Sequence, residues 1–319
     1  MKAVLQRSYG PPAKALTVED VPKPELGPDQ VLVRVQASSI NSGDCRICRA
    51  DPIFVRFIGG FRRPKNPAFG GDVAGVVETV GPEFAGQLNP GDEVFGVKTG
   101  AVAEYAAGTN FVAKPKALTM EQAAAVPITA ITALQALRDQ GELKPGQKVL
   151  VNGAGGGVGT MAVQIAKAFG GVVTAVTGTD KVSMVTRLGP DSTLDRNRDD
   201  FTLDTGIYDL IVDIAGDHSL GSTRRALKSD GTLVIVGSHK GVLRRLMIGT
   251  VRRAVFKQRI KFFIASVTRD DLETIRQLID GGKVQPVIDR VFPIDQTVEA
   301  VEYAEGMQAA GKVVIAVAG

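Results

Sequence analysis

The chain has 319 residues, of which 44% are hydrophobic and 23% are charged. This composition is that of an ordinary soluble globular protein, and the length allows two domains with sizeable cores. A net charge of +4 gives no reason to expect a nucleic-acid partner, residues 1–12 lack the apolar stretch of a signal peptide, and no run of about 18 apolar residues predicts a transmembrane helix.

The first third of the chain is predicted to be mostly antiparallel β-structure. Apolar, β-branched runs at 31–35, 73–80 and 93–97 have the composition of strands. Gly81-Pro82 and Pro90-Gly91-Asp92 are turn signals beside them.

Two cysteines, Cys45 and Cys48, lie in this part of the sequence. A structural zinc site needs four ligands, and the sequence offers no second cysteine pair. We interpret the two as reduced thiols, because a redox role would need a thioredoxin-like fold around them. A chain without a disulfide framework fits the cytoplasm.

The middle of the chain alternates between helices and strands. A helix is predicted at 119–137, broken at Pro127, and another at 159–169. The predicted strands are 148–151, 172–176, 210–214 and 232–236. This alternation indicates a doubly wound parallel sheet. The C-terminal part, with a helix at 270–280 and strands at 287–292 and 312–317, is expected to return to the first domain.

A glycine-rich motif follows the strand at 148–151. Ala154, Gly156 and Gly159 occupy the three positions of a dinucleotide-binding fingerprint. Gly156 lets the backbone approach a pyrophosphate, and Gly159 lets the next helix pack against its strand. The strand before the motif and the helix after it supply the context that the fingerprint requires. The candidate phosphate-binding residues are Ala154, Gly155, Gly156, Gly157, Val158 and Gly159; the alternative is a turn that holds nothing.

The end of the next strand bears on which dinucleotide binds. NAD-binding proteins usually place a carboxylate there, on the ribose 2′-OH. This sequence has Thr177, Gly178 and Thr179, followed by Lys181. We expect Lys181 and Arg196 to bind a 2′-phosphate and therefore predict NADPH as the cofactor. Asp180 argues in the opposite direction, and the alternative is that Lys181 is simply solvated.

Four separated segments resemble the medium-chain dehydrogenase/reductase superfamily, and its quinone oxidoreductase branch in particular. They are Ser39–Asp44, Gly70–Val77, Ala123–Ala133 and Gly311–Val314. The resemblance implies a Rossmann-like domain (121–262) inserted in a GroES-like, mostly antiparallel β domain (1–120 and 263–319), with an active site in the cleft between them. It also implies that the chain acts as a homodimer on a small quinone or α,β-unsaturated carbonyl.

The resemblance further implies that no zinc is bound. Alcohol dehydrogenases of this superfamily hold a catalytic zinc with a Cys, a His and usually a second Cys. Those positions fall here on Asn41, on Gly71 and in the region of Ile128 and Thr129. Without that metal, alcohol oxidation by the zinc route is not supported.

The same resemblance suggests the residues around the reacting groups. Asn41 is expected to donate a hydrogen bond to the substrate carbonyl, and Asp44 to orient its loop; either can instead be structural. No tyrosine occurs at 51–55, where related enoyl reductases often carry a proton donor, and this weakens reduction of enoyl thioesters. Further cofactor contacts are expected from Thr129, Thr132, Ile214, Ala215, Gly216, Val236, Gly237, Ser238, Phe263 and Lys312.

Residues 240–261 carry eight cations and no acid, with apolar residues between them. A basic amphipathic helix can lie on an anionic membrane. We favour instead a helix whose charges are solvated and whose apolar side packs against protein, so that membrane binding is not expected. A nucleotide-binding scaffold or sensor with little turnover is the main functional alternative to a reductase.

Overall fold

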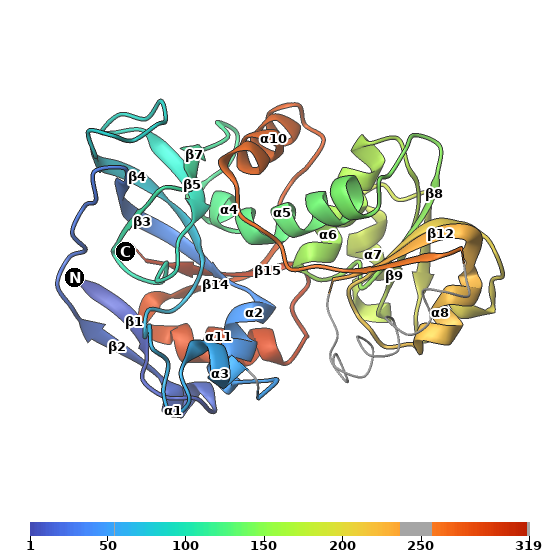
Figure 1. The fold of residues 1–319 in the computed structure, drawn as a ribbon, viewed down its shortest axis with the longest axis horizontal. Helices are drawn as coiled ribbons and strands as arrows, with labels where there is room; N and C mark the ends of the chain where they lie inside the picture. Colours follow the sequence, from blue (N-terminus) through green and yellow to red (C-terminus); the bar gives the residue numbers. More distant parts are fainter. Residues whose placement is uncertain (54, 237–256, 318–319) are drawn as a thin grey trace. The chain divides into compact units, whose positions relative to one another are not determined.

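The computed structural model describes residues 1–53, 55–236 and 257–317. The chain forms two compact units. The first unit comprises Met1–Thr129, Val267–Asp280 and the chain from Pro286 onwards, and the second comprises Ala130–Ser266 and Gly281–Gln285. Both chain ends therefore belong to the first unit (Figure 1). No helix among the described residues is long and apolar enough to cross a membrane.

The first unit is built on a seven-stranded sheet in which β14-β15-β3-β4-β5-β7 are neighbours in that order and β6 pairs with β3. Its strands are β3 (Val31–Ile40), β4 (Asp72–Val80), β5 (Glu93–Val97), β6 (Tyr105–Gly108), β7 (Phe111–Ala113), β14 (Ile288–Pro293) and β15 (Lys312–Ala316). All pairs are antiparallel except β14 with β15. A separate antiparallel hairpin joins β1 (Lys2–Gln6) to β2 (Leu16–Asp20).

Strand β3 pairs with β15, β4 and β6 and is buried along most of its length. Val31, Leu32, Val33 and Val35 are all buried, and Arg34 is the one exposed residue of the strand. The first unit's α-helices are α1 (Pro12–Ala15), α2 (Ser42–Arg49), α3 (Val55–Gly59), α4 (Met120–Ala124), α10 (Arg269–Asp280) and α11 (Thr297–Glu305).

The second unit is a six-stranded parallel sheet with the order β10-β9-β8-β11-β12-β13. The strands are β8 (Lys148–Asn152), β9 (Val172–Thr177), β10 (Ser192–Asp195), β11 (Tyr208–Asp213), β12 (Leu227–Ile235) and β13 (Arg259–Phe262). Counted along the chain this is the order 3-2-1-4-5-6, the Rossmann arrangement, which reverses direction between β8 and β11. Its α-helices are α6 (Gly157–Ala168), α7 (Val182–Thr186) and α8 (Leu220–Ala226).

Helix α5 (Pro127–Gln135) continues past the division of the chain, since Thr129 belongs to the first unit and Ala130 to the second. The helix expected at 119–137 is indeed interrupted just before Pro127: α4 ends at Ala124, α5 begins at Pro127, and a π-helical turn (Ala136–Gln140) follows. The division lies C-terminal to the boundary expected at residue 121.

One expectation is wrong at the end of the basic segment. We expected a helix to residue 261, but Arg259–Phe262 form strand β13 beside β12. Arg259 and Lys261 are also not simply solvated, because both pair with Glu142 at 3.1 and 3.0 Å. Residues 240–256 of that segment, and with them most of its cations, lie outside the described residues.

Candidate functional site

The glycine-rich loop joins β8 to α6 in the second unit. Gly153 has a φ of +94°, and the N–H groups of Gly153 and Ala154 donate to the Val176 carbonyl of the neighbouring strand. A Cβ on Gly159 would lie 2.1 Å from the Gly153 oxygen, so only glycine lets α6 approach the loop. A Cβ on Gly156 would meet nothing nearer than 3.8 Å. The loop therefore has an open face at the N-terminus of a twelve-residue helix, where N–H groups attract an anion.

Two cations flank the end of β9, as the sequence predicts. A Cβ on Gly155 would lie 2.5 Å from Thr177 Oγ1 and 2.8 Å from Lys181 Cδ, so the Lys181 stem lies against the loop. A Cβ on Gly178 would lie 3.7 Å from Nε of Arg196, whose backbone N–H donates to the Thr177 carbonyl. The structure thus brings Lys181 and Arg196 to one strand end, from segments on either side of α7.

Carboxylates also gather there, and one of them was missed from the sequence. Asp180 Oδ1 is 2.8 Å from the position of a Cβ on Gly178. Asp195 ends β10 and is only 8% exposed; the Thr179 hydroxyl donates to its carboxylate, and so does the Asn197 N–H. The Asn197 bond is the main cause that lowers the pKa of Asp195. The hydroxyl hydrogen of Thr179 is therefore committed to Asp195.

The loops after β8 and β11 are joined where the strand order reverses. Asn152 Nδ2 donates to Asp213 Oδ1 at 2.9 Å and to Asp217 Oδ1 at 2.8 Å, and Gly216 N–H also donates to Asp213. The N–H groups of Ile214 and Ala215 donate to the Asn152 carbonyl, and that of Val236 donates to the Asp213 carbonyl. These bonds hold the expected residues after β11 against the glycine loop. Gly237 and Ser238, expected to lie nearby, are outside the described residues.

A buried polar cluster lies in the first unit, at the point where β3 leads into α2. Asn41 is 8% exposed, and its Nδ2 donates to Asp72 Oδ2 at 2.8 Å. Its Oδ1 accepts from Lys312 Nζ at 2.6 Å. Lys312 opens β15, which pairs with β3 so that Val313 lies opposite Ile40. Sheet pairing therefore brings the two ends of the first unit's sequence to one place.

Asp44 caps the same helix. Its carboxylate accepts from the Asn41 N–H at 2.8 Å at the start of α2. The residue keeps some exposed surface, yet burial of the carboxyl raises the pKa of Asp44 to about 6, with the Asp72 charge adding to this effect. Cys45 and Cys48, on the buried side of α2, are free thiols, and burial is the main cause that raises their pKa values to about 12 and about 11. Such thiols are poor nucleophiles.

Two family models match the sequence, and relatives match it over nearly its whole length. Residues 27–114 match an alcohol dehydrogenase GroES-like domain, and residues 188–315 match a model described as zinc-binding dehydrogenase. A 2-methylene-furan-3-one reductase of Solanum lycopersicum is 32% identical over 99% of this chain and 79% of its own length. A quinone oxidoreductase of Lama guanicoe is 31% identical over 99% of this chain and 97% of its own. The solved quinone oxidoreductase of Coxiella burnetii has a TM-score of 0.85 at 28% identity, covering 100% and 99% of the two chains.

The chain belongs to the medium-chain dehydrogenase/reductase family. The GroES-like and Rossmann-like domains expected from the sequence are thereby confirmed. The family binds NAD(P), and the second unit fits such a dinucleotide on its own geometry. The open face at Gly156 leaves room for a pyrophosphate, the N-terminus of α6 supplies N–H donors, and two cations stand at the end of β9.

The positions that carry zinc ligands in the family's alcohol dehydrogenases come together in this fold without the ligands. Asp72, next to Gly71, accepts from Asn41 Nδ2 and from the Ile128 N–H at 2.9 Å. A Cβ on Gly71 would lie 2.7 Å from Ile128 Cδ1, so the Ile128 side chain fills the place where a histidine would begin. Among the described residues, no group of three or more His, Cys, Asp or Glu residues is arranged to hold a metal. The residues present do not fit the catalytic zinc.

Four other residues were expected to contact the cofactor: Thr129, Thr132, Phe263 and Lys312. The Thr129 hydroxyl donates to the Ala125 and Val126 carbonyls at 3.1 Å, in the turn that precedes its helix, which leaves its oxygen as an acceptor. Thr132 and Phe263, both half-buried, lie in the second unit. Lys312 was expected among the cofactor contacts, but its side chain is 3% exposed and its ammonium donates to groups of the first unit.

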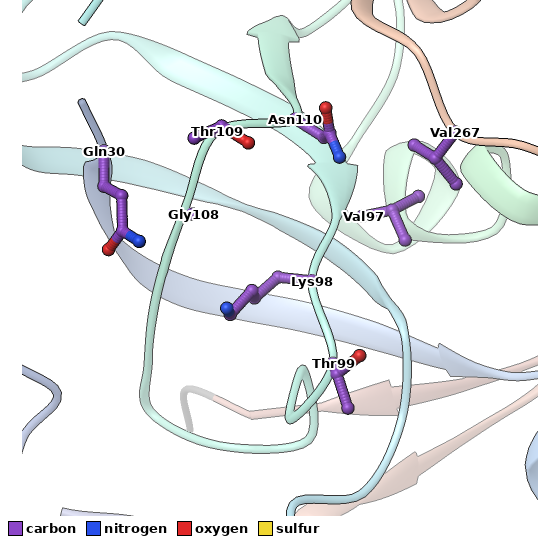
Figure 2. A pocket seen from close by; sticks show the side chains of 8 residues that line it. All are labelled: Gln30, Val97, Lys98, Thr99, Gly108, Thr109, Asn110 and Val267. Carbon is purple, nitrogen blue, oxygen red and sulfur yellow. The ribbon is translucent and has the colours of Figure 1, made fainter. Parts of the chain in front are cut away.

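A hollow of about 250 Å³ on the first unit contains none of these residues. Figure 2 shows the side chains of Lys98 and Gln30 extending toward each other across it. Its lining is Gln30, Val97, Lys98, Thr99, Gly108, Thr109, Asn110 and Val267. None of these lining residues was predicted to belong to a functional site.

Proposed function

We propose that this protein is an NADPH-dependent reductase that transfers hydride to a quinone or an α,β-unsaturated carbonyl without zinc. The carrying observation is the pair of cations, Lys181 and Arg196, beside the glycine loop at the end of β9. Membership of an oxidoreductase family supports the reaction class, and relatives named as quinone and enone reductases support the substrate class. The cytoplasmic location and the homodimer remain predictions from the sequence.

The nucleotide, when bound, supplies the hydride, and the protein supplies position and electrostatics. The N–H groups at the start of α6 bind the pyrophosphate, and Lys181 and Arg196 bind the 2′-phosphate through charge-assisted bonds. Asn41 donates a hydrogen bond to the carbonyl oxygen, on which negative charge develops as hydride adds to the substrate. Solvent water then protonates the product, so the reaction needs no acid from the protein.

The test is the rate of NADPH oxidation across a panel of quinones, enals, enones and enoyl thioesters. We expect turnover with quinones or with enals and enones, and little with thioesters. The matched control is Gly156→Val: the added side chain fills the face of the loop where no protein atom lies within 3.8 Å of a Cβ. This variant should fold but lose nucleotide binding and turnover. Tight NADPH binding with no turnover on any acceptor would favour a scaffold or sensor instead.

A further inference from the structure

The amide of Asn41 is held between a buried cation and a buried anion. Lys312 and Asp72 are 2% and 0% exposed, and their charged groups are 3.4 Å apart. Lys312 Nζ has three hydrogens and three acceptors: Ile40 O at 3.0 Å, Asn41 Oδ1 at 2.6 Å and Asp72 Oδ2. Its donors are therefore matched within the first unit.

Chemistry alone decides which way this amide points. An ammonium group cannot accept a hydrogen bond, so the Asn41 atom that faces Lys312 must be Oδ1. An ionised carboxylate cannot donate, so the atom that faces Asp72 must be Nδ2. The usual ambiguity of an Asn side chain is thus removed. Asp72 uses one of the two hydrogens on Nδ2, and among the described residues it is the partner at hydrogen-bond distance of this atom. The Asp44 carboxylate interacts with the Asn41 side chain more weakly, and this is the smallest of the causes that act on the pKa of Asp44.

Asp72 is itself fixed from several elements. Its Oδ2 accepts from Ser39 Oγ at 2.6 Å on β3, and its Oδ1 accepts from the Ile128 N–H at the start of α5. A carboxylate with this many donors has little freedom to move. The Lys312 charge on Oδ1 also draws electrons from the amide, which makes its remaining N–H a stronger donor.

We propose that Asp72 and Lys312 are positioning residues that lock Asn41 so that its remaining N–H meets the substrate's carbonyl oxygen. This proposal rests on the proposed reductase function. It assigns to Lys312 the role of orienting Asn41, and not of contacting the cofactor. A merely structural pair would tie β15, β3 and β4 together without any particular relation to Asn41.

A double-mutant cycle separates these roles. Lys312→Met, which keeps the length but removes the charge, should lower kcat by roughly 10- to 100-fold, with the Kd for NADPH changed less than about twofold. In the Asn41→Ala background, Lys312→Met should lower kcat no further, because it acts through a group that is already gone. Independent, multiplicative losses would overturn the proposal.

A milder pair of variants covers the case in which Lys312→Met does not fold. Ser39→Ala removes one hydrogen bond from Asp72 and should lower kcat a few-fold, again only when Asn41 is present. The matched control is Thr297→Ala, which removes another buried hydroxyl of the first unit, one that donates to the Ile294 carbonyl. It should cost stability and leave kcat unchanged. Equal effects of the two variants on kcat would contradict the proposal.

Nuclear magnetic resonance of the side-chain amides distinguishes failure of this proposal from failure of the reductase function. The Asn41 NH₂ signal is identified by its loss in Asn41→Ala. It should shift in Ser39→Ala and stay fixed in Thr297→Ala, whether or not any acceptor is reduced. An Asn41 signal that Ser39→Ala leaves unmoved would overturn the positioning role. A wild-type protein that reduces nothing, yet shows the shift, would overturn only the proposed function.

Discussion

Asn41 is the residue on which the proposed chemistry depends most. Asn41→Ala removes one neutral hydrogen bond to the developing oxyanion, a loss of up to about 3 kcal/mol. We therefore expect kcat/KM to fall by as much as about 100-fold, while the Kd for NADPH barely changes because the glycine loop lies in the other unit. Steady-state rates and nucleotide titration measure the two effects. Asn89→Ala, an exposed Asn of the same unit, is the control, and an unchanged rate for Asn41→Ala would make Asn41 structural.

Asp44 predicts a pH dependence of stability. Its pKa is raised from 3.8 to about 6, mainly by burial, so the folded protein holds this proton more tightly than the unfolded chain does. The stabilisation is complete below pH 4 and is lost as the pH rises through 6. The Asp44→Asn variant has no carboxyl to ionise and does not lose this stability. Its free energy of unfolding relative to that of the wild type should therefore increase between pH 4 and 7. The increase should be at most about 3 kcal/mol, and less where solvent reaches the Asp44 carboxyl.

Denaturant unfolding of both proteins at a series of pH values makes this measurement. A stability difference that stays constant with pH would show that the Asp44 carboxyl ionises in the folded protein as it does in the unfolded chain, and one that decreases as the pH rises would show that folding lowers its pKa. Either result would contradict the prediction. In the first case the role of the Asp44 carboxyl would be limited to the hydrogen bond with the Asn41 N–H.

At the scale of elements, we propose that the end of β9 determines the preference for NADPH over NADH. Two charge-assisted contacts should make NADPH bind about tenfold more tightly than NADH, after screening and the opposing Asp180 charge are allowed for. Lys181→Ala should reduce that ratio and leave NADH binding nearly unchanged. Asp180→Asn should increase it, because the carboxylate beside Gly178 repels a 2′-phosphate. Fluorescence titration with both nucleotides measures the ratio.

The control for these variants is Lys144→Ala, an exposed lysine of the same unit that precedes the amino end of β8. It should leave both affinities unchanged. Equal affinities of the wild type for the two nucleotides, or a Lys181→Ala variant that keeps the full preference, would mean that these cations do not bind a 2′-phosphate.

The elements that the sequence predicts well are those with a strong apolar pattern. β5 was expected at 93–97 and β8 at 148–151, and both occur there because each has a run of buried apolar residues, such as Val94 and Phe95 in β5 and Val149–Val151 in β8. β10 was missed because Ser192–Asp195 is short and polar at the sheet edge. β13 was misread because its cations alternate with Ile260 and Phe262, and charge at that density looked like a solvated helix face.

The candidate site shows the same limit at longer range. The sequence predicts that Lys181 lies near the glycine loop, because both belong to one β-α-β unit. Nothing local connects Lys312 with Asn41, which are 271 positions apart and meet only because β15 pairs with β3. For the same reason the sequence could not show that the Asp72 carboxylate accepts a hydrogen bond from the Asn41 side chain. Which distant residues meet depends on the pairing register of their strands, and this register cannot be derived from a single sequence.

On the scale of the whole molecule, the proposed function assigns nucleotide binding and turnover to different units. The nucleotide cradle lies within the second unit, and the cluster of Asn41, Asp72 and Lys312 lies within the first. Changes in the second unit should therefore alter nucleotide affinity first, and changes in this cluster should alter turnover. The positions that correspond to the zinc ligands of the family's alcohol dehydrogenases, at Asn41, Gly71 and Ile128, all lie in the first unit.

The most direct test of this account is the rate of NADPH oxidation with the best acceptor, measured before and after removal of metal by a chelator. Metal content is determined on the same samples. We predict no stoichiometric zinc, an unchanged rate after chelation, and a higher kcat/KM with NADPH than with NADH. A rate that disappears on chelation and returns with added zinc would contradict the account.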